Sequence, residues 1–248
     1  MPDETNTQAQ RVRPLGTLAN RTGFTSSSGR SAMAENASIA PVGTEGEFLA
    51  YRREGFRAAG EPVGTMPRPA SVLGAATQAV SFVEGRNMAV LLDKIGERLA
   101  FERTGTRLYD TLLEKYETSG SYPGGPTREE LEEIRDEEAE HFAMLARAVE
   151  QLDGDPTAVT PSADLAAVAS SGLIQVLGDP RTRLGECLEA ILIAELTDVD
   201  AWTGLAALAE RLGHGELAAS FRDAESEEEE HLDLVRTWVS ARAELGGA

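Results

Sequence analysis

Apolar residues recur every three or four positions in four long stretches of this chain, and that spacing is typical of amphipathic helices. The stretches cover about residues 87–116, 128–152, 182–212 and 216–245. No segment alternates apolar and polar residues with a period of two, so no β-sheet is expected. The pattern predicts an all-α fold whose helices bury one face each.

Turn-forming residues mark where the predicted helices end. The first helix stops before the segment TSGSYPGGP, and the segment GHG separates the third helix from the fourth. Thr127 precedes the second helix and Glu130 follows three residues later, which is the pattern of a capping box. These signals predict two helix pairs, each joined by a short turn.

A longer connection, from about residue 153 to residue 181, links the two pairs. A structureless loop of that length would be unusual in a compact domain, so the apolar piece DLAAVASSGLIQVL is expected to form a helix of its own. The predicted architecture is therefore a four-helix bundle with one long crossover connection.

Residues 1–85 have a different composition from the rest of the chain. They are rich in Gly, Ser, Thr, Pro and Ala, with short apolar islands at 48–51 and 80–83. Such a composition cannot bury much surface by itself. We expect a largely irregular N-terminal extension, flexible or packed on the domain or on another subunit, followed by a bundle domain over 86–246. The extension could also dock another protein.

The two predicted helix pairs resemble each other. FERTGTRLYDTLLEK in the first pair aligns with AELTDVDAWTGLAAL in the second, which places Glu102 over Glu195 and Tyr109 over Trp202. If a two-fold axis perpendicular to the bundle relates the pairs, the second and third helices run parallel. Parallel neighbours cannot be joined by a tight turn, so the repeat accounts for the long crossover.

The second helix of each pair carries a Glu-x-x-His motif, Glu138 with His141 and Glu228 with His231. Residues three apart share one helix face, and all four positions fall on the inward stripe. A single motif of this kind is weak evidence, because chance alone could supply one in a chain with 30 glutamates. Here two of the three histidines have a glutamate three residues earlier, at matching positions of the two helix pairs. This coincidence favours a metal site over a solvated acidic helix face.

Four glutamates converging in a core would repel each other and take up protons unless cations balanced them. Two divalent cations would balance Glu102, Glu138, Glu195 and Glu228 while His141 and His231 stay neutral. Oxygen ligands with one nitrogen for each ion suit iron or manganese. The predicted cofactor is thus a pair of iron ions, with two manganese ions or a mixed iron and manganese pair as alternatives.

The charge balance, the cysteine count and the absence of long apolar segments limit the binding partners and the cellular location that we expect for this protein. The formal net charge is −19, and residues 1–70 hold 8 basic and 7 acidic side chains, leaving 15 basic and 35 acidic ones for the rest. This balance argues against nucleic acid or an anionic membrane as a partner. The single cysteine excludes a cysteine-ligated zinc or iron site. No signal peptide or membrane span is visible, so a cytoplasmic protein is expected.

The segments DKIGERLAFERTGTRLYDTLL, GDPRTRLGECLEAILIAEL and EEEEHLDLVRTW resemble the ferritin-like dimetal carboxylate superfamily over about residues 62–245. In that superfamily two helices each give one Glu and two each give Glu-x-x-His, and all six positions match. The resemblance implies that Glu102 and Glu195 are the carboxylates most able to bridge or shift between ions. It also implies homodimer formation.

Five further residues are candidates for supporting roles. Glu137 and Glu227 could orient the opposite imidazole, although exposed acidic residues are the commoner reading. Asp198 lies one turn from Glu195, while Tyr109 and Trp202 could transfer electrons or simply pack the core.

The ligand set favours an oxidoreductase acting on O2 or H2O2, most simply a ferroxidase. Three alternatives stay open: a manganese catalase-like centre, an oxygenase or oxidase for an organic substrate, and a metal-binding or structural bundle without turnover.

Overall fold

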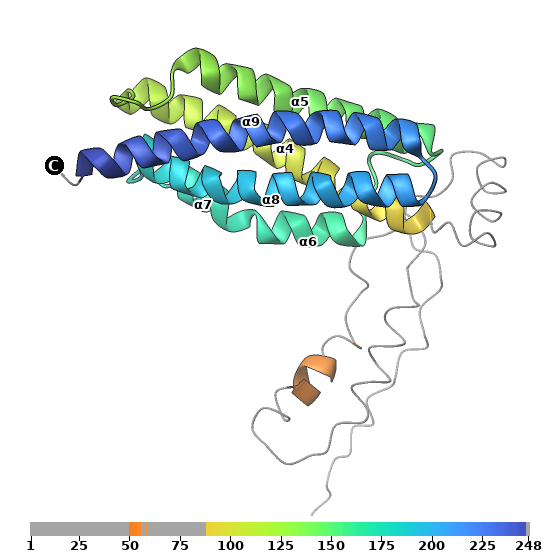
Figure 1. The fold of residues 1–248 in the computed structure, drawn as a ribbon. Helices are drawn as coiled ribbons and strands as arrows, with labels where there is room; N and C mark the ends of the chain where they lie inside the picture. The colour runs from red at the N-terminus through yellow and green to blue at the C-terminus, as the bar shows by residue number, and fades with distance from the viewer. Residues whose placement is uncertain (1–49, 56–57, 59–87, 247–248) are drawn as a thin grey trace, which may run out of the picture.

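A computed structural model of the protein describes residues 50–55, 58 and 88–246. Residues 50–55 and residue 58 are helical, and the rest of the expected extension lies outside the described residues. The bundle is built from six helices (Figure 1), and the described residues contain no strand. The helices are α4 (Met88–Ser119), α5 (Arg128–Gln151), α6 (Pro161–Ala169), α7 (Ser171–Gly178), α8 (Leu184–Arg211) and α9 (Gly215–Gly246).

Four long helices, α4, α5, α8 and α9, form the bundle (Figure 1). α4 packs antiparallel on α5, and α8 packs antiparallel on α9. α5 and α8 run in the same direction, so the chain must return along the bundle between them, and α6 and α7 make that return (Figure 1). The all-α four-helix bundle with one long crossover is therefore confirmed.

Local chemistry sets the ends of the long helices. Thr127 and Glu130 form both hydrogen bonds of the predicted capping box at the start of α5. α4 ends just before Gly120, whose φ of 68° is a backbone conformation that favours glycine, and whose N–H donates to the carbonyl of Tyr116 at 2.8 Å. Gly213, with φ 85°, has the same role between α8 and α9.

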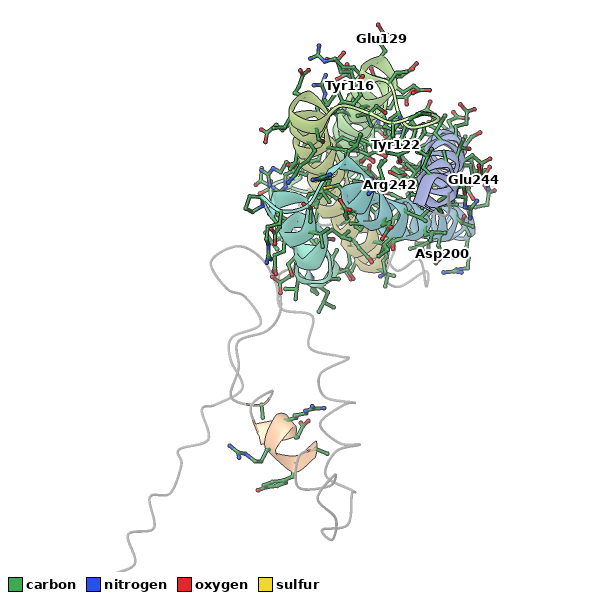
Figure 2. The ribbon with its side chains drawn as sticks, turned by 90° about the vertical axis from the view of Figure 1, so that its left-hand side faces the viewer. Tyr116, Tyr122, Glu129, Asp200, Arg242 and Glu244 are labelled. Atoms are coloured by element: carbon green, nitrogen blue, oxygen red, sulfur yellow. The ribbon has the colours of Figure 1, made fainter. Side chains whose placement is uncertain are left out.

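The connection between α4 and α5 closes one end of the bundle, seen end-on in Figure 2. Tyr122 donates its hydroxyl hydrogen to the backbone carbonyl of Trp238 at 2.9 Å. The guanidinium of Arg242 lies 5.7 Å from the centre of the Tyr122 ring (Figure 2). A Cβ at Gly185 would lie 1.9 Å from Nη1 of Arg242, so the guanidinium occupies the space beside this glycine at the start of α8.

The crossover contains two helices where the sequence predicts one. α6 ends before Ser170, whose hydroxyl donates to the carbonyl of Ala166 at 2.8 Å, and α7 begins at Ser171. Serine hydroxyls compete for backbone groups, and Gly172 follows with its low helix propensity. The run Ser-Ser-Gly therefore allows a break, after which α7 packs on α8 as well as on α4.

Polar contacts fasten the crossover, because few of its apolar side chains are buried. Ala163 is the buried residue of α6 and Leu177 that of α7. The carboxylate of Asp93 on α4 accepts the backbone N–H of Ser162 at 2.9 Å and its hydroxyl at 2.8 Å. At the other end, the Lys115 ammonium donates to the carbonyl of Asp179 at 2.6 Å.

The core consists of two apolar clusters with a polar layer between them. One cluster contains Trp202 and Phe221 with residues from the start of α4 and the end of α5. The other contains Tyr109 and Trp238 with residues from the end of α4 and the start of α5. The layer between the clusters lies near the middle of each long helix. No helix among the described residues is long and apolar enough to cross a membrane.

We predict that Gly96→Ala destabilises the protein, because a Cβ at Gly96 would lie 2.5 Å from Oγ1 and 2.6 Å from Cγ2 of Thr160. Thr160 caps α6 and its branched side chain has little freedom to move. The expected loss in free energy of unfolding is about 1–3 kcal/mol, measured in urea. Gly204→Ala, in an open position of α8, should gain about 0.5–1 kcal/mol. Equal effects of the two changes would contradict this account of the packing.

Candidate metal centre

The middle layer of the bundle brings six sequence-predicted side chains together, and each is at most 3% exposed. α4 and α8 each contribute one glutamate, whereas α5 and α9 each contribute a glutamate and a histidine one turn apart. The six residues are Glu102, Glu138, His141, Glu195, Glu228 and His231. Because each helix buries its apolar face on both sides of these positions, the polar groups face one another across the bundle.

The two imidazoles are held by carboxylates from the opposite helix. His141 Nε2 on α5 lies 2.7 Å from Glu227 Oε2 on α9, and His231 Nε2 on α9 lies 2.7 Å from Glu137 Oε2 on α5. A carboxylate accepts, so each Nε2 carries a hydrogen, and Nδ1 is the nitrogen that faces inward. Glu137 and Glu227 are partly exposed at the surface, and each still fixes a buried ring.

Several inward atoms lack hydrogen-bond partners. One oxygen of each core glutamate is buried and unpartnered: Oε2 of Glu102, Glu138 and Glu195, and Oε1 of Glu228. Nδ1 of His141 lies 2.8 Å from that Glu228 oxygen, but the two are not aligned for a hydrogen bond. Unpartnered buried oxygens are costly and rare in proteins. Their convergence is the arrangement that a bound cation would satisfy.

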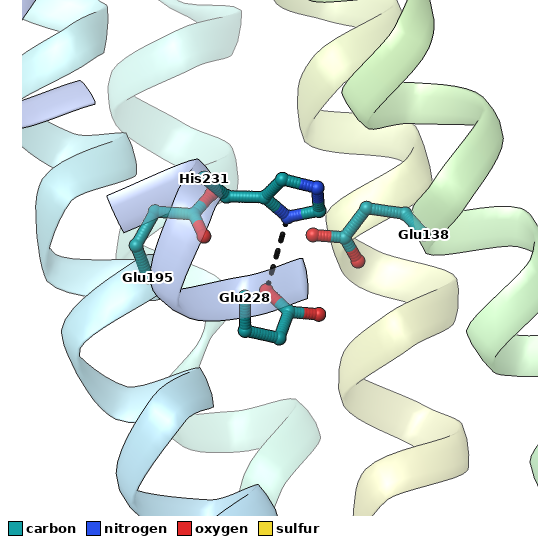
Figure 3. A group of neighbouring side chains, drawn as sticks. All are labelled: Glu138, Glu195, Glu228 and His231. Atoms are coloured by element: carbon teal, nitrogen blue, oxygen red, sulfur yellow. Dashed lines mark hydrogen bonds and ion pairs between the residues drawn. The ribbon is translucent and has the colours of Figure 1, made fainter. Parts of the chain in front are cut away.

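Distances between the ligand atoms define three overlapping groups. The first contains one atom each from Glu138, Glu195, Glu228 and His231, all within 4.8 Å of one another (Figure 3). In this group His231 Nδ1 lies 3.2 Å from Glu228 Oε2. The second group is Glu102, His141 and Glu228, and the third adds Asp198 to Glu102, Glu138 and Glu228. Glu228 belongs to all three groups, so its carboxylate lies between two candidate ion positions.

A buried ion pair lies beside this cluster and was not predicted from the sequence. Arg98 on α4 is 2% exposed, and its Nη2 donates to both Glu102 Oε1 and Asp198 Oδ1. In the sequence Arg98 precedes Glu102 by four residues, which usually marks an exposed pair along a helix. Arg98 lies on the same helix face as the apolar residues Leu91 and Ile95, and this spacing could have indicated that it is buried.

Among the described residues the core holds five buried carboxylates and one guanidinium, Arg98. With neutral imidazoles the formal charge of the layer is −4, because Arg98 offsets the additional carboxylate of Asp198. Two divalent cations would balance that charge. The donor set, which combines carboxylate oxygens and imidazole nitrogen without sulfur, suits iron or manganese.

Without a metal, protons must reduce the repulsion. Burial and the charges of Glu228 and Glu102 raise the pKa of Glu138 well above its usual range. Burial and the charge of Glu228 raise the pKa of Glu195 to about 8. Burial alone would lower the pKa values of His141 and His231, but the surrounding carboxylates raise them to about 11 and about 9.

Glu228 behaves in the opposite way because both imidazoles contact it. Burial would raise its pKa, yet the close approach and charge of the His141 and His231 imidazoles lower the pKa to about 2. Near neutral pH the central carboxylate therefore stays ionised while Glu138, Glu195 and both imidazoles hold protons. A cation that enters the layer must displace those protons.

Tyr109 and Trp202, which the repeat aligns, differ in their contacts. The Tyr109 hydroxyl donates to Glu195 Oε1 at 2.5 Å, and burial raises its pKa well above the usual value, with Glu195 adding to the effect. The Trp202 ring packs edge-on against His141 at 5.5 Å between centres, and its buried Nε1 has no hydrogen-bond partner. Tyr109 thus holds one oxygen of Glu195, while Trp202 packs against a histidine.

Fold and site together define a helical-bundle protein with a buried cluster of carboxylates and histidines. Residues 125–243 match the family model of the ferritin-like domain. The match spans α5 to α9, and the structure supplies α4 as the remaining helix of the bundle. The matched part of the chain is therefore similar to the ferritin-like domain, and the bundle and its buried ligand cluster are consistent with that superfamily. Comparisons with curated proteins and with solved structures give no match.

We predict that the metal-free protein loses stability as the pH rises from 6 to 8.5. The raised pKa values of Glu195 and His231 mean that the folded state binds protons more tightly than the unfolded state. That contribution is complete below the unfolded values, near 4.5 and 6.5, and is lost as the pH passes through about 8 and about 9. Thermal unfolding in chelator should therefore show a falling Tm.

Glu195→Gln is the control, since an amide does not titrate, and its Tm should fall less over the same range. Saturating Mn2+ should also reduce the fall. A Tm that rises or stays level with pH in the metal-free wild type would contradict the protonation of the cluster.

Proposed function

We propose that the cluster is a dimetal centre and that the protein is an oxidoreductase acting on O2 or H2O2, most simply a ferroxidase. One observation supports this most directly: each of the four core glutamates has a buried oxygen without a hydrogen-bond partner, and these glutamates contribute ligand atoms to overlapping groups whose atoms lie within 4.8 Å of one another. The proposed ligands are Glu102, Glu138, His141, Glu195, Glu228 and His231, and the proposed metal is iron.

Two reduced ions bound by these ligands would supply two electrons together, so that O2 or H2O2 would be reduced without release of a one-electron radical. The side chains perform the other tasks. Glu137 and Glu227 keep both Nδ1 atoms facing inward through their 2.7 Å contacts to the outer nitrogens. The apolar clusters on both sides keep bulk water away from the ligands, which strengthens every charge interaction within the layer.

Glu102 and Glu195 are the proposed carboxylates that rearrange during the reaction. Each has one oxygen held by a donor, Arg98 for Glu102 and Tyr109 for Glu195, and each leaves its other oxygen unpartnered. Such a carboxylate would keep one oxygen on its protein donor while the other oxygen held a bound ion. Glu228, whose two oxygens lie beside the two imidazoles, would be a ligand at both ion positions.

A manganese catalase-like centre is the second candidate, because the same oxygen and nitrogen donors suit manganese. Metal analysis of protein purified from cells, followed by a peroxide dismutation assay, separates it from the iron enzyme. A storage or structural bundle would bind metal without turnover in either assay. Homodimer formation, a cytoplasmic location and a docking role for the extension remain predictions of the sequence.

We predict that Glu228→Gln abolishes binding of two metal ions per chain, because Glu228 belongs to every group of candidate ligands. Glu229→Gln is the matched control, since Glu229 is the next residue in the same glutamate run and is exposed. Mn2+ titration by calorimetry should give two ions for wild type and for the control, and one or none for Glu228→Gln.

Stopped-flow absorbance after mixing Fe2+ and O2 tests the chemistry in the same three proteins. Wild type and Glu229→Gln should oxidise iron well above the rate in buffer, whereas Glu228→Gln should not. Wild-type protein that binds metal but oxidises no iron would favour the catalase-like or structural candidates. Identical binding by both variants would contradict the proposed centre.

A further inference from the structure

A guanidinium lies beside the proposed ligands, at a depth where an unpaired charge would be very costly. Arg98 Nη2 contacts Glu102 Oε1 on its own helix and Asp198 Oδ1 on α8. Its guanidinium carbon lies 4.7 Å from the Phe101 ring centre and 5.4 Å from the Trp202 ring centre. Two carboxylates and two aromatic rings therefore fix its position.

Asp198 is close enough to the cluster to be a ligand itself. One of its oxygens lies within 4.8 Å of oxygens from Glu102, Glu138 and Glu228, and its exposure is 1%. A free carboxylate at that position would bind an adjacent cation. Its contact with Arg98 engages Oδ1, so the ion pair competes with metal for Asp198.

The pair of Arg98 and Asp198 has no counterpart at the equivalent positions of the internal repeat. The alignment that pairs Glu102 with Glu195 also pairs Arg98 with Ile191 and Asp198 with Gly105. At Gly105 a Cβ would lie 2.1 Å from Glu138 Oε2. The missing side chain on α4 therefore makes room for Glu138, which is a proposed ligand. On α8 the equivalent position is Asp198, and the guanidinium of Arg98 on α4 holds its carboxylate.

We propose that Arg98 is a positioning residue that limits the ligand set of the dimetal centre. It holds Glu102 to a single inward oxygen and withholds Asp198, so that coordination positions stay available for O2 or peroxide. The inference rests on the proposed function, because it concerns the same centre. A carboxylate that binds with both oxygens, or a seventh ligand, would occupy the positions at which the oxidant must bind.

Arg98→Met tests the proposal, because it frees both carboxylates and removes a positive charge from the layer. Mn2+ affinity measured by calorimetry should rise by about 10-fold, while the rate of Fe2+ oxidation should fall by about 10-fold or more. Opposite changes are the diagnostic result, since damage to the fold would lower affinity and rate together. Arg103→Met, which removes an exposed arginine of α4, should change neither.

Two further variants separate the two roles of Arg98. Arg98→Met with Asp198→Asn removes the additional ligand, so affinity should return towards the wild-type value and the rate should partly recover. Arg98→Lys keeps one charge but cannot hold both carboxylates, and should lie between wild type and Arg98→Met. If Arg98→Met does not fold, the same measurements of affinity and rate on Arg98→Lys test the proposal.

Affinity and rate that fall together in Arg98→Lys, or that both stay at wild-type values in Arg98→Met, would overturn the role of Arg98. Wild-type protein that binds no Mn2+ and no Fe2+ would instead overturn the proposed function. The two failures are therefore distinguishable in the same set of titrations.

Discussion

Repulsion among buried carboxylates is the constraint on which the rest of this structure depends. Five acidic side chains share the middle of the bundle with one arginine and two histidines, each of them nearly inaccessible to solvent. Water cannot stabilise the charges there, so cations or protons must. The helices hold the ligands on four separate backbones, and the apolar clusters on both sides keep those backbones packed. Without such support the carboxylates would turn outwards to solvent.

The two helix pairs are linked through the imidazoles. Glu137 precedes a proposed ligand on α5 and holds His231 on α9, while Glu227 precedes a proposed ligand on α9 and holds His141 on α5. α5 and α9 make less contact with each other than either makes with its antiparallel partner. These reciprocal contacts therefore connect the two helices where apolar packing is sparse, and they tie the orientation of each ring to the opposite helix.

Much of the fold could be predicted from the sequence, because helical periodicity, caps and turns are local signals. The stripe of α5, with Glu138 and His141 among leucines and isoleucine, already indicated which side chains face inward. The break at Ser170 was missed because an apolar run does not show where tertiary packing interrupts it. Arg98 was missed because an arginine four residues before a glutamate resembles a surface pair, and only the packing of α8 places Asp198 against it.

The protons on the ligands and the positive charge of Arg98 also determine whether the protein needs metal to fold. A site whose ligands could not take up protons would leave the metal-free chain with four uncompensated charges in its core. Here the raised pKa values of Glu138, Glu195 and both histidines allow protons to occupy the site near neutral pH, and Arg98 neutralises Asp198 permanently. The bundle therefore contains its own means of balancing the cluster, so that a binding cation would exchange with protons in a folded protein rather than create the fold.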